Sequence, residues 1–292
     1  MIEAPGEYQR WVLAARPRTL PAACVPVVIG TLLIRPLTIN WLNSTLCLVV
    51  ALALQVATNY ANDYSDGVRG ADEERVGPFR LTVSKLVPAR SVRTAAWLGF
   101  AVAGVAGLWL SSRTSWWLVL VGLSAMLAGW FYTGGPKPYG YYGFGELFVF
   151  IYFGLVATVG TAYVQHLNIP TRAWWLGVAA GFMACALLEA NNLRDVDGDR
   201  AAGKNTLAAR LGRKRGAWLY VVCVAGVVVG VVGARQLAVV IAAVVLYLPA
   251  LRMAFSEKKG RELVVLLEYS ARAQLALGAL LAVLLTTNSY WG

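Results

Sequence analysis

The chain has 292 residues, of which 58% are hydrophobic and only 14% charged, and its formal net charge is +11. Soluble domains carry roughly a quarter of charged residues, so this composition excludes an ordinary soluble domain and predicts a protein embedded in lipid. The basic excess could indicate nucleic-acid binding, but its distribution along the chain points to membrane topology instead, and we expect no nucleic-acid partner.

Nine apolar segments approach the ~20 residues that a helix needs to cross a bilayer. In chain order they are residues 19–34, 41–61, 95–112, 115–132, 144–165, 173–192, 217–233, 236–253 and 263–286. We expect no cleavable signal peptide, because the residues before Thr19 are polar and Arg35 follows the first apolar segment. The sequence therefore predicts an all-α, polytopic membrane protein in which residues 1–292 form one membrane domain.

Basic residues alternate between the two ends of these helices. Of the 26 Lys and Arg residues, 21 fall in the amino-terminal tail and after the second, fourth, sixth and eighth segments, four fall on the other side, and Arg272 lies inside the last segment. By the positive-inside rule, the amino terminus and the loops 62–94 and 191–216 are cytoplasmic and the carboxyl terminus is external. We expect the protein to reside in the cell (inner or plasma) membrane.

The second apolar segment ends in a polar stripe. At about 100° per residue, Asn59, Asn62 and Asp66 share one helix face with Gln55, and Asp63 lies just beside them. Acidic groups inside a membrane helix cost roughly 2.5–3.5 kcal/mol each and normally serve a function. This stripe is therefore a candidate site rather than a solvated helix end.

The sixth apolar segment ends in a second acidic cluster. Asn191, Asn192, Asp195 and Asp199 share one face, and Asp195 and Asp199 are one helical turn apart. Carboxylates and amides without histidine or thiolate partners suit a hard, oxygen-seeking cation, for which Mg²⁺ is the cofactor we expect. The predicted metal ligands are Asn62, Asp63, Asp66, Asn192, Asp195 and Asp199.

Polar and basic residues that could reach a phosphate lie next to both clusters. The predicted diphosphate-binding residues are Asn59, Arg16, Arg69, Arg80, Lys85, Arg194 and Lys204. Metal ions held by carboxylates and surrounded by Arg and Lys form a diphosphate site, and apolar helices above it could enclose a long hydrocarbon chain. The sequence contains no Walker A loop and no dinucleotide fingerprint, so ATP and NAD are not supported.

These paired acidic motifs resemble the UbiA superfamily of intramembrane aromatic prenyltransferases. Several stretches are similar to its 1,4-dihydroxy-2-naphthoate polyprenyltransferases of menaquinone biosynthesis. They are Ala15–Pro21, Asn62–Gly70, Arg75–Arg80, Tyr132–Pro136, Gly143–Glu146 and Asn191–Asp195, within a resemblance that spans residues 11 to about 270. The resemblance implies nine helices around a central cavity.

The resemblance also implies a reaction and its participants. A polyprenyl diphosphate would donate its chain, with Mg²⁺, to 1,4-dihydroxy-2-naphthoate, which loses CO₂ to give a demethylmenaquinol. Asp66 and Asp195 are the expected catalytic carboxylates, and Tyr132 could stabilise an allyl cation through its ring. Lys137 and Glu146 are weaker candidates for the acceptor side.

One position departs from the family pattern. Many members carry a further aspartate four residues after the Asp66 position, where this chain has Gly70. Asp63 or Asp72 could supply that carboxylate, and Asp63 is favoured because it lies beside the stripe.

Other interpretations remain. Within the family, 4-hydroxybenzoate or homogentisate could be the acceptor. A CDP-alcohol phosphotransferase also uses intramembrane aspartates, but in one contiguous motif. A cation-coupled transporter would place its carboxylates near the bilayer midplane on broken helices, whereas these lie at helix ends beside basic loops.

Overall fold

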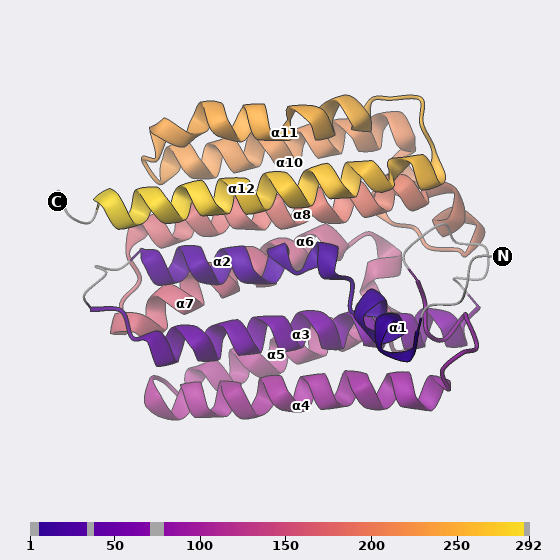
Figure 1. Ribbon diagram of the computed structural model, residues 1–292, viewed down its shortest axis with the longest axis horizontal. Helices are drawn as coiled ribbons and strands as arrows, with labels where there is room; N and C mark the ends of the chain where they lie inside the picture. The colour runs from indigo at the N-terminus through magenta and orange to yellow at the C-terminus, as the bar shows by residue number, and fades with distance from the viewer. Residues whose placement is uncertain (1–5, 34–37, 71–78, 289–292) are drawn as a thin grey trace.

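The computed structural model describes residues 6–33, 38–70 and 79–288, and across these ranges it contains helices and no β-strand. Figure 1 shows the long helices side by side in a single bundle. The prediction of an all-α membrane protein is confirmed.

Seven helical segments in the described ranges are long and apolar enough to cross a membrane. They are α3 (Trp41–Val68), α4 (Ala89–Arg113), the continuous run of α6 (Gly145–Val149), η4 (Phe150–Val156) and α7 (Ala157–His166), α8 (Thr171–Ala201), α10 (Arg213–Gly233), η5 (Leu237–Val239) with α11 (Val240–Ala254), and η6 (Gly260–Leu263) with α12 (Val264–Asn288).

The first predicted span is part of a bent pair. α1 (Glu7–Ala14) and η1 (Pro17–Thr19) meet α2 (Pro21–Leu32) at 53°, and together they would make an eighth span. The fourth predicted segment, α5 (Trp117–Phe131), is apolar but has only 15 residues. All nine predicted segments correspond to helices, but the described residues support seven or eight full spans, slightly fewer than nine.

α3 and α8 are longer than their predicted apolar segments. Residues 62–68 and 191–201 are helical, so the loop boundaries 62–94 and 191–216 begin too early. Most of their acidic and amide side chains are buried against other elements rather than exposed at a frayed end, and these are Asn62, Asp63, Asp66, Asn192, Asp195 and Asp199. Both polar clusters are therefore carried on rigid helices.

α8 lies at the centre of the bundle. It packs against α10, η4, α12 and α7, and its apolar face includes the fully buried Leu176 and Met183. α3 packs chiefly against α4, with α5 beside them. α3 and α8 both end near α1, whereas α12 ends at the opposite end of the bundle (Figure 1). The two polar clusters are thus brought to the same end of the molecule, as the sequence predicted.

The chain after α8 reverses direction sharply. Gly203 has a φ of 71°, which other residues rarely adopt, and the Lys204 N–H then donates to the Asp199 carbonyl at 2.7 Å. Thr206 caps the short helix α9 (Leu207–Leu211) by accepting from the Ala209 N–H at 3.2 Å. This turn directs Lys204 back toward α3.

Candidate active site

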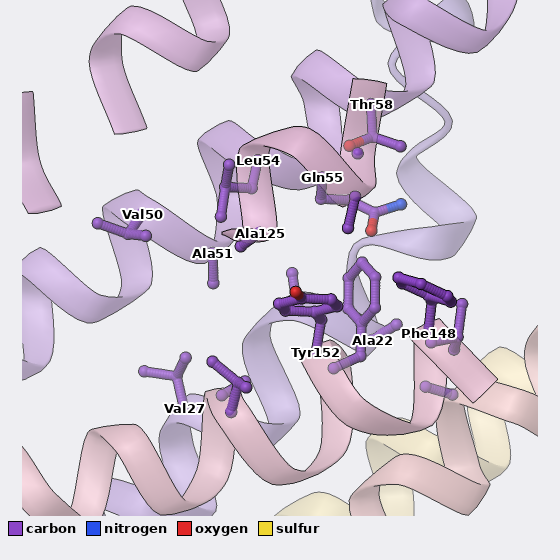
Figure 2. Close-up of a pocket in the computed structure, with 18 of the residues that line it drawn as sticks. Ala22, Val27, Val50, Ala51, Leu54, Gln55, Thr58, Ala125, Phe148 and Tyr152 are labelled. Atoms are coloured by element: carbon purple, nitrogen blue, oxygen red, sulfur yellow. The ribbon is translucent and has the colours of Figure 1, made fainter. Parts of the chain in front are cut away.

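Two adjoining chambers lie inside the bundle. The larger, apolar cavity has a volume of about 290 Å³ and is lined by α2, α3, α5, the α6–η4–α7 run and α8. Figure 2 shows Val50 and Leu54 of α3 on one side of it and Phe148 and Tyr152 on the other. The smaller, polar chamber has a volume of about 80 Å³ and lies where α3 and α8 end. Residues shared by the two linings are Arg16, Asn62, Tyr132, Leu188 and Asn191.

Asp66 is the carboxylate of α3 in the polar chamber, and it is only 2% exposed. Its Oδ2 accepts from Lys204 Nζ at 2.8 Å, and Arg80 Nη2 lies 3.9 Å from the same oxygen. Its Oδ1 accepts from the Tyr141 hydroxyl at 2.8 Å. Asp66 therefore joins three segments that are far apart in the sequence.

Asp63 has a different environment, although it precedes Asp66 by only three residues, about one turn of α3. Its two oxygens accept from the backbone N–H groups of Leu81 and Thr82 at 2.8 and 3.1 Å. This carboxylate holds the segment that carries Arg80 against α3. The geometry favours a loop-anchoring role for Asp63, and Asp72, the other candidate for the missing carboxylate, lies outside the described residues.

Two further contacts anchor the segment after α5 to α3. The Asn62 Oδ1 accepts from the Thr133 hydroxyl at 2.8 Å, and Arg69 donates to the carbonyl groups of Thr133 and Gly135. Arg69 also lies over the Tyr141 ring, with its Cζ 5.7 Å from the centroid. Asn62 lines the polar chamber, whereas Arg69 is exposed and lies outside that lining.

On α8, Asp195 and Asp199 have different surroundings. Arg194 makes a two-point contact with Asp195, at 2.8 Å from Nε to Oδ1 and 2.6 Å from Nη2 to Oδ2, and both side chains are almost fully buried. Asp199 lines the polar chamber, where its Oδ2 accepts from the Thr206 hydroxyl at 3.3 Å. Arg194 also lines the chamber, but Asp195 lies outside the lining.

The remaining predicted residues are spread more widely. Lys85 and Lys137 are exposed and line neither chamber. Asn59 lines the apolar cavity and donates to the Ala15 carbonyl at 2.9 Å, so it holds the turn before η1 in place. Glu146 lines neither chamber but accepts from the Asn192 side chain at 2.9 Å.

Tyr141 is a site residue that the sequence analysis missed. Burial, and next the negative charge of Asp66, raise the pKa of Tyr141 above its ordinary value, so the phenol stays protonated and donates to Asp66. Lys204 Nζ also lies 5.0 Å from the centroid of its ring. Tyr141 lies in the polar and aromatic turn after α5, where the sequence has no helical periodicity that could reveal it. Its contact with Asp66 forms only when that turn folds over α3.

Tyr132 stands at the boundary between the chambers and begins a row of aromatic side chains. Its ring packs edge-on against Tyr139 with centroids 5.5 Å apart. Tyr139 stacks on Phe148 at 4.0 Å, and Phe148 is followed by Tyr152 at 6.2 Å. This row leads from the polar chamber into the apolar cavity, where electron-rich ring faces could interact with a cation or an aromatic molecule.

The charge of the polar chamber favours an anion. Its lining contains the basic side chains of Arg16, Arg80, Arg194 and Lys204 and the carboxylates of Asp66 and Asp199. Arg16 reaches it from a backbone with a φ of 55°, a conformation that costs free energy in a residue with a side chain. Such a basic lining fits a ligand of several negative charges, such as a diphosphate.

The oxygen donors of this chamber also suit Mg²⁺. Within the described ranges, no three His, Cys, Asp or Glu side chains are close enough to hold a metal by themselves. The chamber instead offers two carboxylates, Asp66 and Asp199, and the amides of Asn62 and Asn192. Mg²⁺ is usually held by one or two carboxylates together with substrate phosphates and water, so the donor set fits this ion.

Fold and site together define a multi-pass membrane protein with a basic, polar chamber that leads into an apolar cavity. The profile of the UbiA prenyltransferase family matches residues 23–263, and the chain therefore belongs to that family. It is a prenyltransferase.

Known relatives span nearly the whole chain. A 1,4-dihydroxy-2-naphthoate octaprenyltransferase of Mycobacterium tuberculosis is 46% identical over 275 residues, which cover 92% of this chain and 94% of the relative. A protein of the same name from Escherichia coli is 37% identical over 221 residues, covering 70% and 69% of the two chains. The solved structure of a UbiA homolog from Archaeoglobus fulgidus bound to GPP and Mg²⁺ has the same fold, with a TM-score of 0.66, 14% identity, and coverage of 95% and 99%.

Proposed function

We propose that this enzyme transfers the chain of a polyprenyl diphosphate to 1,4-dihydroxy-2-naphthoate with loss of CO₂, and so forms a demethylmenaquinol for menaquinone biosynthesis. The observation that carries the reaction class is the basic, oxygen-lined chamber at the mouth of an apolar cavity. The assignment of 1,4-dihydroxy-2-naphthoate as the acceptor is supported by the names of the relatives. They include five 1,4-dihydroxy-2-naphthoate octaprenyltransferases at 34–46% identity.

The polar chamber would bind the diphosphate. Arg16, Arg80, Arg194 and Lys204 supply N–H donors to phosphate oxygens, and Asp66, Asp199, Asn62 and Asn192 supply oxygen ligands for Mg²⁺. Bound Mg²⁺ would draw negative charge from the diphosphate as it leaves the allylic carbon. Lys204 and Arg80, which neutralise Asp66 in the structure, lie within the same lining and can donate to the leaving group.

The apolar cavity would enclose the reacting carbon and the start of the prenyl chain. The cavity has a volume of about 290 Å³, and its mostly aliphatic and aromatic lining would disfavour water, which could otherwise capture an allyl cation. Tyr132 lines both chambers, and this supports a role in which its ring would stabilise positive charge on the carbon that the diphosphate leaves.

The acceptor supplies most of the remaining chemistry. Its electron-rich carbon that bears the carboxylate forms the new C–C bond as the allylic C–O bond breaks. The product is a β-keto acid, whose C–CO₂⁻ bond breaks readily because the ketone accepts the electron pair and aromaticity returns. The hydroxyl proton lost when the ketone forms is regained by the phenolate after CO₂ leaves, so no net proton is consumed and no strong base is required.

We further propose that the polar chamber faces the cytoplasm and that the protein lies in the cell membrane. The support is the distribution of basic residues, most of which fall at the chamber's end of the helices. In this orientation the charged diphosphate and acceptor would reach the site from the cytoplasm and the prenyl chain from the lipid.

A panel of acceptors tests the proposed function. Purified enzyme in detergent would be incubated with Mg²⁺, a polyprenyl diphosphate and 1,4-dihydroxy-2-naphthoate, 4-hydroxybenzoate or homogentisate, and the products identified by mass spectrometry. We expect prenylation of the naphthoate alone. Preferred prenylation of either benzene acid would refute the acceptor assignment but not the family.

A further inference from the structure

Glu146 makes a contact that its predicted acceptor-binding role does not explain. It lies at the start of α6, and its Oε1 accepts from Asn192 Nδ2 on α8 at 2.9 Å. Glu146 lines neither chamber, whereas Asn192 is 7% exposed and lines the polar chamber. Glu146 is therefore separated from the proposed substrates by the residue that it contacts.

An asparagine amide has two different ends, and its partner decides which end faces the site. A carboxylate can only accept hydrogen bonds, so Glu146 selects the NH₂ end of Asn192. The carbonyl oxygen Oδ1 is then left for the other side of the amide, where the polar chamber lies. Reversal of the amide would place two N–H donors in the chamber instead of an oxygen, and a metal ion would be repelled.

We infer that Glu146 is a positioning residue that holds the Asn192 amide with its oxygen toward the chamber, as a ligand for the metal ion of a metal–diphosphate complex. This inference rests on the proposed function. It assigns Glu146 to the diphosphate side of the site rather than to the acceptor, and it predicts that Glu146 acts on metal affinity through Asn192. Partners that orient metal ligands in this way commonly change metal affinity by about 10–100-fold when they are removed.

The experiment measures metal binding without turnover. Thermal unfolding of the full-length protein in detergent is followed with saturating inorganic pyrophosphate while Mg²⁺ is varied, and the Mg²⁺ concentration for half-maximal stabilisation is recorded. We expect Glu146→Leu to raise this concentration by about 10–100-fold. Glu146→Gln can accept from or donate to the Asn192 amide, so it no longer selects one orientation and should shift the midpoint in the same direction but less than Glu146→Leu. If Glu146→Leu does not fold, Glu146→Asp withdraws the acceptor by one methylene and should also shift the midpoint.

Two controls separate orientation of Asn192 from general damage. The Cys185 thiol donates to the backbone carbonyl of Glu146 at 3.3 Å, so Cys185→Ala removes a neighbouring contact and should leave the Mg²⁺ midpoint unchanged. In an Asn192→Ala background, Glu146→Leu should cause no further shift, because both changes remove the same oxygen ligand.

The outcomes distinguish this inference from the proposed function. Additive shifts in the double variant, or a raised acceptor KM at an unchanged Mg²⁺ midpoint, would overturn the positioning role and leave the proposed function intact. A wild-type protein that pyrophosphate and Mg²⁺ do not stabilise would overturn both.

Discussion

At the residue scale, Asp66 connects several parts of the candidate site through polar contacts. Lys204, Arg80 and Tyr141 converge on its two oxygens from three separate segments. The two cations and the phenol hold this carboxylate in place, and the same cations could also contact a diphosphate in the chamber. Asp66 is accordingly the residue whose charge should matter most.

We expect Asp66→Asn to lower turnover by at least ~100-fold, because Asp66 is a proposed metal ligand and the change removes its charge from a site shielded from water. The variant nearly preserves shape, so the protein should remain folded, and raising Mg²⁺ should recover part of the rate. Asp197→Asn is the matched control, since Asp197 is exposed on α8 beyond the chamber, and it should keep most activity. Near-normal turnover of folded Asp66→Asn would contradict the assigned role.

Asp195 should behave differently because Arg194 already binds both of its oxygens. Removing one member of a buried ion pair leaves the other charge without compensation, which typically costs about 3–5 kcal/mol. We expect Asp195→Asn to lower the unfolding temperature clearly while leaving the Mg²⁺ requirement unchanged. A normal unfolding temperature combined with a higher Mg²⁺ requirement would show instead that Asp195 is a direct metal ligand, as the sequence alone suggested.

The comparison of Asp63, Asp66 and Asp195 shows what sequence can predict about such a site. Helical spacing correctly identified a polar face on α3 and another on α8 that meet at one end of the bundle. Spacing could not separate a carboxylate that faces the chamber from one that caps backbone N–H groups or pairs with its neighbour. For Asp63 and Asp66 that distinction depends on the segments after α3, α5 and α8, whose conformations follow from tertiary contacts, and for Asp195 it depends on the side-chain conformation of Arg194.

At the element scale, the region from Gly145 to His166 shapes one wall of the apolar cavity. Its middle, η4, is a π-helix, a form common at functional sites, and Tyr152 of η4 points into the cavity (Figure 2). η4 packs against α8 at Gly154, where an added Cβ would lie 2.4 Å from the Gly181 Cα. The two backbones therefore approach too closely for any side chain at this position.

We expect Gly154→Ala to destabilise the protein by about 1–3 kcal/mol, since η4 must move away from α8. The cavity wall should shift with it, so activity should also fall. Gly198→Ala on α8 is the matched control, because nothing lies within 4 Å of its added Cβ. Thermal unfolding of both variants checks this, and equal stability of the two would contradict the close packing of η4 on α8.

At the scale of the whole molecule, hydrophobicity and charge identified the fold class and the order of the helices. The composition sufficed because a lipid-embedded chain must satisfy its backbone hydrogen bonds within helices. The exact number of membrane spans could not be predicted from the sequence, since α5 is short and the first span is bent by 53°. The ends of α3 and α8 were placed too early because polar residues there were interpreted as the beginning of loops.

The charge distribution makes a prediction about orientation. Reporter fusions after residues 90 and 215 should both report a cytoplasmic location, and a fusion at the carboxyl terminus an external one. α1 and the carboxyl end of α12 lie at opposite ends of the bundle, which is consistent with an odd number of crossings (Figure 1). A cytoplasmic carboxyl terminus would mean that one of the shorter or bent segments does not cross the membrane.

The most direct test of the central claim measures the fate of the acceptor's carboxylate. Purified enzyme with Mg²⁺, a polyprenyl diphosphate and 1,4-dihydroxy-2-naphthoate labelled at the carboxyl carbon would be assayed for labelled CO₂ and for prenylated product. We predict equal molar amounts of labelled CO₂, diphosphate and demethylmenaquinol, with none formed when Mg²⁺ is removed by a chelator. A prenylated product that retains the label would contradict the account.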